Sequence, residues 1–89
     1  MTINHAAAME IRVHFYSYFK DLTGCAATVM PVAAGSTLRE LLDRVRERFP
    51  VLRPLEKSTL VAVGVEYQSG NYVLAAGDEV SLFPPVQGG

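Results

Sequence analysis

One amphipathic helix constrains this 89-residue chain more than any other feature. Apolar residues recur at positions i, i+3, i+4, i+7 and i+11 from Leu38 to Phe49, the spacing of one helix face. Thr37 is a favourable N-cap, and Glu40 three positions later completes a capping box, so we expect the helix to begin there. Pro50 ends it. A single apolar stripe has to be buried, and one helix with no helical partner favours packing on a sheet.

The segments around the helix carry strand patterns. From residue 10 to 16 apolar and polar residues alternate, which places Ile11, Val13 and Phe15 on the buried side and Arg12, His14 and Tyr16 on the other. A second strand is expected over residues 27–32, as a hairpin return from the first strand. Another is expected over residues 60–65, with Gly64 inside it or at its end. The last strand ends the domain, with Val80 and Leu82 facing inward.

The connections have turn chemistry. Residues 17–24 predict a short helical turn ended by Gly24, with Phe19 and Leu22 tucked under the domain. Pro54 keeps the segment after the main helix irregular, residues 66–71 predict a turn, and residues 75–78 turn the chain into the last strand. The fold class is α+β: a mixed sheet with one main helix packed across one face, formed by residues 9–83 and preceded by a flexible extension over residues 1–8.

The last residues have an unusual composition. Pro84 and Pro85 cannot donate to a sheet ladder and favour an extended path, so the last strand should stop near Phe83. Gly88 and Gly89 lack a Cβ, so they can pass through a narrow passage and leave the terminal carboxylate sterically open. We therefore expect residues 84–89 to form an extended tail, although Gly-Gly alone also fits a frayed terminus.

Composition excludes several function classes. The net charge is −1 with acidic and basic residues interspersed, which is not the basic footprint of a nucleic-acid-binding protein. One cysteine cannot form an internal disulfide, and neither a secretion signal nor a membrane span is evident, so we expect a cytoplasmic protein without membrane contact. The sequence has no cluster of cysteine and histidine at metal-ligand spacing.

No catalytic constellation stands out. Cys25 has no neighbouring base or cation to activate it and is interpreted as an inert thiol. His14 is the one histidine of the domain and is interpreted as a surface residue. Asp78 and Glu79 are adjacent at a strand entry, where their side chains point to opposite faces rather than to one substrate atom. We therefore expect no enzyme activity from the isolated chain.

Gly77-Asp78-Glu79, an alternating strand, Phe83-Pro84-Pro85-Val86 and a terminal Gly88-Gly89 together resemble the MoaD family, the small sulfur-carrier subunit of molybdopterin synthase, which is ubiquitin-like. The resemblance covers residues 9–89. It implies a β-grasp fold, which agrees with the element order. One departure is Gly64, where the family pattern usually has Asn in a turn.

The resemblance also implies a reaction. An activating enzyme would use ATP to adenylate the carboxylate of Gly89, and a sulfur donor protein would convert it to a thiocarboxylate. The tail, Pro84, Pro85, Val86, Gln87 and Gly88, would then enter the large catalytic subunit of a heterotetramer and deliver sulfur to cyclic pyranopterin monophosphate. No cofactor would be bound permanently.

Two further residues follow from strand parity. First and last strands are parallel neighbours in a β-grasp sheet, so outward-facing Tyr16 and Phe83 should lie together beside the tail's root. We expect them to form an apolar anchor for the large subunit. Three alternatives stay open at this point. The first is a sulfur carrier for another pathway, such as thiamine thiazole or cysteine synthesis, the second is a ubiquitin-like modifier that joins Gly89 to target lysines, and the third is an interaction domain with an inert tail.

Overall fold

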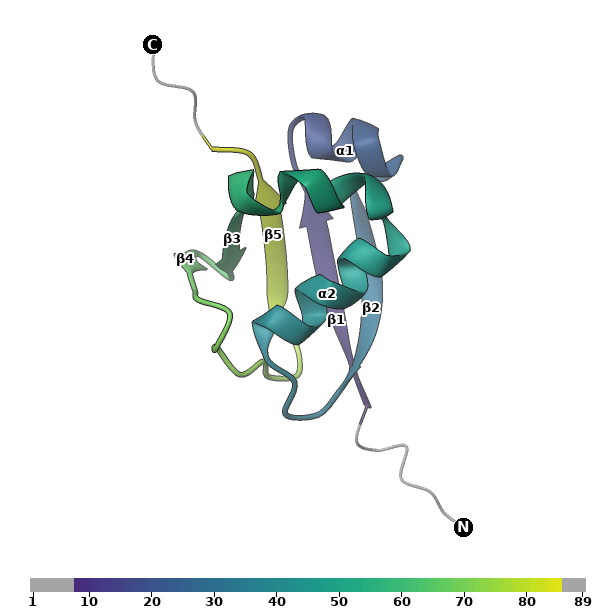
Figure 1. The fold of residues 1–89 in the computed structure, drawn as a ribbon. Coiled ribbons are helices and arrows are strands. Elements are labelled where there is room, and N and C mark those ends of the chain that lie inside the picture. Colours follow the sequence, from purple (N-terminus) through teal and green to yellow (C-terminus); the bar gives the residue numbers. More distant parts are fainter. Residues whose placement is uncertain (1–7, 86–89) are drawn as a thin grey trace.

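The expected strands assemble into a single mixed sheet. The computed structural model describes residues 8–85. Its elements are the strands β1 (Ala8–Phe15), β2 (Ala27–Ala33), β3 (Leu60–Val63), β4 (Glu66–Tyr67) and β5 (Glu79–Phe83), the helices α1 (Tyr18–Thr23) and α2 (Leu38–Arg48), and the 3-10 helix η2 (Pro50–Ser58). The strand order is β2-β1-β5-β3-β4. The helices α2 and η2 cross one face of this sheet, which confirms the α+β β-grasp architecture (Figure 1).

Strand register confirms the predicted parity. β1 pairs antiparallel with β2 and parallel with β5, and Val13 lies opposite Val80. Ile11 and Val13 are fully buried, Phe15 is 1% exposed, and the intervening side chains face the uncovered side. β1 begins at Ala8, one residue before the domain boundary expected at residue 9, and residues 1–7 lie outside the described part of the chain.

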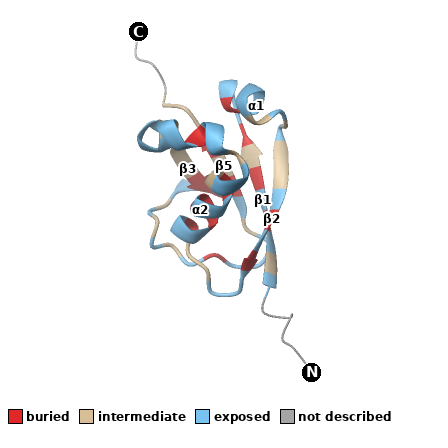
Figure 2. Cartoon of the chain, turned by 45° about the vertical axis from the view of Figure 1, so that its right-hand side comes forward, coloured by how far each residue is buried: buried red, intermediate tan, exposed pale blue. Residues whose placement is uncertain are grey.

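The main helix begins where the capping box predicts. The Thr37 N–H donates to Glu40 Oε1 at 2.8 Å, and the Glu40 N–H donates to Thr37 Oγ1 at 3.3 Å. These two bonds satisfy donors that a helix start would otherwise leave unpaired. The helix thereby holds its apolar stripe over the sheet, where four of its residues are buried: Leu38, Leu41, Leu42 and Val45 (Figure 2).

Three local expectations were wrong. Leu22 is 40% exposed, because α1 has only six residues and Phe19 alone fills the space beneath it. The segment after Pro50 is a 3-10 helix rather than an irregular turn, since its Leu52 packs into the core and fixes the conformation. Residues 66–71 are not wholly a turn, because Glu66 and Tyr67 pair with β3 as the edge strand β4.

Gly64 explains how β4 arises. β3 ends at Val63, and Gly64 and Val65 connect it to Glu66 as a two-residue hairpin turn. Gly64 has φ +62°, and a two-residue turn with glycine first is typical of type II′. Asparagine is the residue with a Cβ that most readily adopts positive φ, so both Gly64 and the asparagine of the family pattern suit a turn with positive φ.

Candidate functional site: the root of the C-terminal tail

The structure ends the last strand at the expected place. β5 stops at Phe83, and Pro84 and Pro85 continue without pairing to a strand. Neither proline has an N–H to donate, so the ladder ends where the proline pair begins. Val86, Gln87, Gly88 and Gly89 lie outside the described residues, and their expected roles stay predictions.

Tyr16 and Phe83 meet beside this root, as parity predicted. The Tyr16 N–H donates to the Leu82 carbonyl at 3.1 Å, which extends the parallel β1–β5 pairing by one residue. The two rings are 6.3 Å apart between centroids and meet edge to face at 83°. An aromatic pair therefore lies directly beside the point where the tail leaves the sheet.

The structure adds two residues that the sequence analysis missed. The Tyr67 ring lies 5.9 Å from the Phe83 ring, and Val65 at the hairpin tip is 98% exposed. The missed signal was Gly64-Val65 between two strand-forming dipeptides, which is a hairpin pattern. Tyr16, Val65, Tyr67 and Phe83 line one hollow of about 420 Å³ on the open face, and we call these four residues the aromatic patch.

The aromatic patch is uncovered in the isolated chain. Tyr16 is 50% exposed and Tyr67 is 65% exposed. Contiguous exposed apolar groups of this kind mark interaction surfaces, because water contact at several large side chains is unfavourable. The patch begins at Phe83, the last residue before the tail, and extends across the open face to Val65, which lies toward the start of β5.

Charged side chains lie on the open face farther from the tail. His14 Nε2 lies 2.8 Å from Glu79 Oε1, across the parallel pair of strands. Asp78 is directed elsewhere: its Oδ2 accepts from the Ala75 N–H at 2.8 Å and from the Tyr72 hydroxyl at 3.1 Å. Asp78 and Glu79 thus serve a turn and a surface pair separately, as expected from their adjacency.

The Asp78 contact also affects Tyr72. The hydrogen bond to the Asp78 carboxylate, followed by desolvation and the nearby negative charges of Asp78 and Glu66, raises the pKa of the Tyr72 hydroxyl above its ordinary value of 10.0. The neutral phenol is thereby favoured as the donor that closes the turn entering β5.

The remaining chemical candidates do not join the patch. Cys25 is half-buried at the end of α1, where its Sγ lies 3.8 Å from Thr23 Oγ1. Within residues 8–85, no group of three or more His, Cys, Asp or Glu side chains is placed to hold a metal ion. In the same range, no helix is long and apolar enough to cross a membrane. The main feature of the described part of the site is therefore the exposed aromatic patch beside the tail's root.

Comparisons with known proteins agree with this architecture. The model of the ThiS family matches residues 13–89. A molybdopterin synthase sulfur carrier subunit from Arabidopsis thaliana is 28% identical over 83 residues, which cover 93% of this chain and 86% of the relative.

Two solved structures share the fold. SAMP1 from Haloferax volcanii superimposes with a TM-score of 0.82 at 24% identity, covering 90% of this chain and 99% of that one. A complex of subunits 1 and 2 of molybdopterin-converting factor from Helicobacter pylori contains a chain with a TM-score of 0.65 at 22% identity, covering 91% and 100%.

Proposed function

The chain belongs to the ThiS family, and from this membership we propose that it is the sulfur-carrier subunit of a molybdopterin synthase. The observation that carries the proposal is the extent of the family match, which runs to Gly89 and so includes the Gly-Gly end. The Arabidopsis relative, similar over nearly the whole chain, is a molybdopterin synthase sulfur carrier subunit. In this proposal the chain is not an enzyme by itself, because the partner supplies the catalytic groups.

The proposed chemistry takes place at the carboxylate of Gly89. One carboxylate oxygen attacks the α-phosphate of ATP, pyrophosphate leaves, and an acyl adenylate forms. Adenylation is needed because a free carboxylate has no good leaving group. A persulfide on the donor protein then attacks the carbonyl carbon, AMP leaves, and an acyl disulfide forms. A thiol cleaves this disulfide, forms a new disulfide with the donor's sulfur, and leaves the thiocarboxylate on Gly89. ATP binds to the activating enzyme, and the carrier holds no permanent cofactor.

Sulfur transfer follows in the large subunit. The thiocarboxylate sulfur attacks a carbon of cyclic pyranopterin monophosphate, and an oxygen substituent leaves that carbon. Water then attacks the carbonyl carbon of Gly89 and restores the carboxylate as the C–S bond to Gly89 breaks. A dithiolene contains two sulfurs, so two loaded carriers are consumed for each product. A narrow, stiff tail suits delivery into a closed site, because little conformational freedom is lost on insertion.

The aromatic patch supports the partner part of the proposal. The Helicobacter pylori structure is a complex of subunit 1 with subunit 2, and we propose that this chain pairs with a large subunit in the same way, as part of a heterotetramer. Tyr16 and Phe83 would anchor that contact together with Tyr67 and Val65. The activating enzyme and the sulfur donor protein are further proposed partners, and the cytoplasmic location stays a prediction.

The fold is also that of a modifier. SAMP1 from Haloferax volcanii shares the fold at 24% identity, and this similarity concerns the fold alone. Ubiquitin-like modifiers and sulfur carriers are both first adenylated at a terminal glycine. The two functions differ in the group that then accepts the activated acyl group. A sulfur carrier for another pathway would differ from the proposed one in the molecule that finally accepts the sulfur.

Intact-mass measurement on the chain isolated from its own cells tests the proposal. We expect a fraction whose mass is raised by replacement of one terminal oxygen by sulfur, and we expect deletion of Gly89 to abolish it. The Cys25→Ser variant is the control, since it removes the one other site in the sequence that could carry added sulfur. An unmodified carboxylate after incubation with ATP, activating enzyme and sulfur source would overturn the proposal, and covalent ladders on other proteins would favour the modifier.

A further inference from the structure

Two hollows on the open face of the sheet join into one trough. The first is the hollow of about 420 Å³ at the aromatic patch, and the second, of about 650 Å³, continues from it to Glu79 at the start of β5. They share four lining residues: Tyr16, Gly64, Val65 and Ser81. We propose that this trough receives one arginine side chain of the large subunit, whose guanidinium group binds Glu79. The proposal rests on the proposed function and deepens it, because it names the group that the partner inserts.

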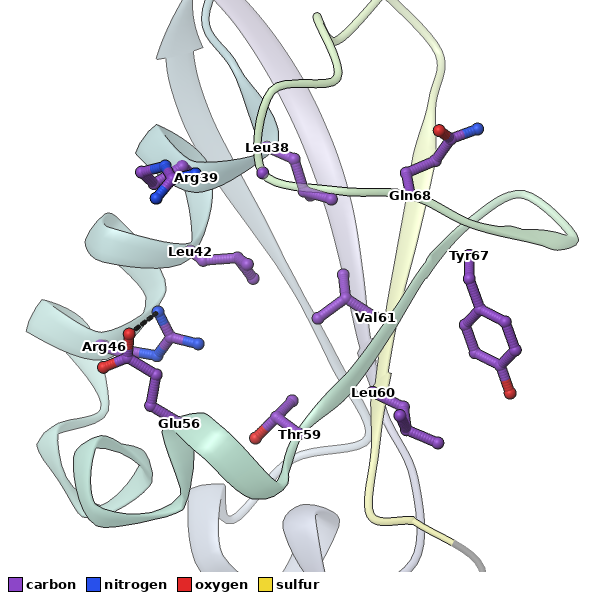
Figure 3. A pocket seen from close by; sticks show the side chains of 11 residues that line it. Leu38, Arg39, Leu42, Arg46, Glu56, Thr59, Leu60, Val61, Tyr67 and Gln68 are labelled. Carbon is purple, nitrogen blue, oxygen red and sulfur yellow. Dashed lines mark ion pairs between the residues drawn. The ribbon is translucent and has the colours of Figure 1, made fainter.

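The trough is open because small residues lie between large ones on this face. Ala62 and Ser81 are register partners on β3 and β5, and both have short side chains. Tyr67 lies opposite Ala62 on β4, and His14 lies opposite Ser81 on β1. In Figure 3 the Tyr67 side chain points away from α2, whereas Val61 points toward it, so Tyr67 lies on the open face. A side chain of the partner therefore fits above Ser81, between larger side chains on both sides.

The charges that line the trough favour a cation. Within residues 8–85, its lining contains one histidine, no lysine or arginine, and the carboxylates of Glu66, Asp78 and Glu79. Asp78 accepts hydrogen bonds within its own turn, but the Glu79 side chain is 58% exposed even with His14 Nε2 at 2.8 Å. Arg12 is the register partner of Glu79, yet it does not line the trough, and no ion pair joins the two in this range. The Glu79 carboxylate is therefore available to a cation of the partner.

The aromatic walls favour arginine over lysine. Tyr16 lines both hollows, and its ring stacks on the His14 ring with the centroids 6.3 Å apart. A guanidinium group is planar, so it stacks on aromatic rings and donates two parallel hydrogen bonds to one carboxylate, whereas an ammonium group is compact and strongly hydrated. Ser81 and Glu79 lie two residues apart on one strand face, about 6.7 Å, a distance that a long arginine side chain spans. An apolar side chain would instead desolvate the Glu79 carboxylate without pairing it.

Two substitutions test the space and the charge of the trough separately. Ser81→Leu fills the space without changing the charge, and Glu79→Gln removes the charge without changing the size. We expect each to weaken the affinity for the large subunit by about tenfold or more, as measured by calorimetric titration with the full-length chain. Binding of the unchanged chain should weaken as salt is added, and Glu79→Gln should reduce this salt dependence.

Each of these variants has a matched control. Ser81→Ala removes the hydroxyl group but leaves the space open. Glu47→Gln makes the same charge change as Glu79→Gln, on an exposed residue of α2 that does not line the trough. Both controls should bind within about twofold of the unchanged chain, because neither alters the space or the carboxylate that receives the guanidinium group. Thermal unfolding of all four variants checks that the fold is intact.

A double-mutant cycle identifies the inserted group. Each surface arginine of the large subunit is replaced in turn by methionine, which keeps an unbranched side chain and removes the charge. We expect one of these variants to bind the unchanged chain about tenfold more weakly or worse. The Glu79→Gln chain should bind that variant and the unchanged large subunit with similar affinity, because the contact is already lost.

Three outcomes would overturn the proposal and leave the proposed function intact. They are a loss of affinity in only one of Ser81→Leu and Glu79→Gln or in neither, an equal loss in Glu47→Gln and Glu79→Gln, and the absence of any arginine coupled to Glu79. A loss in Ser81→Leu alone would assign an apolar side chain to the trough. Failure of the unchanged chain to bind the large subunit would overturn both this proposal and the proposed partner.

Discussion

Phe15 and Tyr16 are adjacent in the sequence and lie on opposite sides of the sheet. Phe15 is 1% exposed and packs edge to face on Phe49 with ring centroids 5.3 Å apart, while Tyr16 is 50% exposed and meets Phe83. The two aromatic contacts are similar in geometry. They differ in that α2 and η2 lie over the sheet face that carries Phe15 (Figure 1), whereas within residues 8–85 no helix lies over the face that carries Tyr16 and Phe83, where the Tyr67 ring is the neighbour of Phe83. One face of the sheet thus stabilises the fold, and the other is available to a partner.

The largest expected effect of a substitution is on the covered face. Phe15→Ala should lower the free energy of unfolding by about 3–5 kcal/mol, because it removes a buried ring and leaves a cavity. Tyr16→Ala should cost less than about 1.5 kcal/mol, since half of the side chain is already in water. Chemical denaturation of both variants measures the difference. Equal losses would mean that the open face contributes to the core after all.

The second effect is on binding rather than on stability. Phe83→Ala should weaken the affinity for the large subunit by about tenfold or more, because aromatic anchors at the centre of an interface carry much of its binding energy. Calorimetric titration with the large subunit measures it.

Val29→Ala is the control for that experiment. Val29 is an exposed apolar residue of the same sheet face on the edge strand β2, distant in strand order from the tail's root. It should bind as the unchanged chain does. A folded Phe83→Ala variant with unchanged affinity would remove Tyr16 and Phe83 from the interface.

The smallest expected effect concerns the hairpin that holds Val65 and Tyr67. Gly64→Ala should cost about 1–2 kcal/mol, because a residue with a Cβ is strained at φ +62°. Gly64→Asn should cost less, since asparagine tolerates this conformation. Thermal unfolding compares the two. An alanine variant as stable as the asparagine variant would show that the turn relaxes, and would weaken the case for a preformed patch.

The two faces were not equally predictable from the sequence. Alternation in β1 and β5 and the capping box at Thr37 assigned the covered face, because burial of a stripe imposes a strict period on the sequence. Parity together with the β-grasp strand order, which the family resemblance implied, placed Tyr16 beside Phe83. The exposed face imposes no such period, so Tyr67 was assigned to a turn. Its two-residue strand β4 is defined by tertiary pairing with β3, which local propensity does not encode.

Leu22 and Leu52 illustrate the same limit. Both are leucines in short helical segments, one 40% and the other 3% exposed. Helical spacing identifies a face only over several turns, and six residues of α1 are too few to distinguish Leu22 from Phe19. For Leu52 the neighbouring prolines suggested irregularity, whereas packing against the core ordered the segment as η2.

The parallel pairing of β1 with β5 has a mechanical consequence. Phe83 lies at the same end of the sheet as Phe15, and β5 is bonded along its length to β1 on one side and to β3 on the other. A pull on the tail acts along the axis of β5. The hydrogen bonds on both sides then resist sliding together, whereas a peeling force would break them one at a time. If the tail is bound in a narrow channel of a partner, this chain can therefore be pulled away repeatedly without unravelling β5.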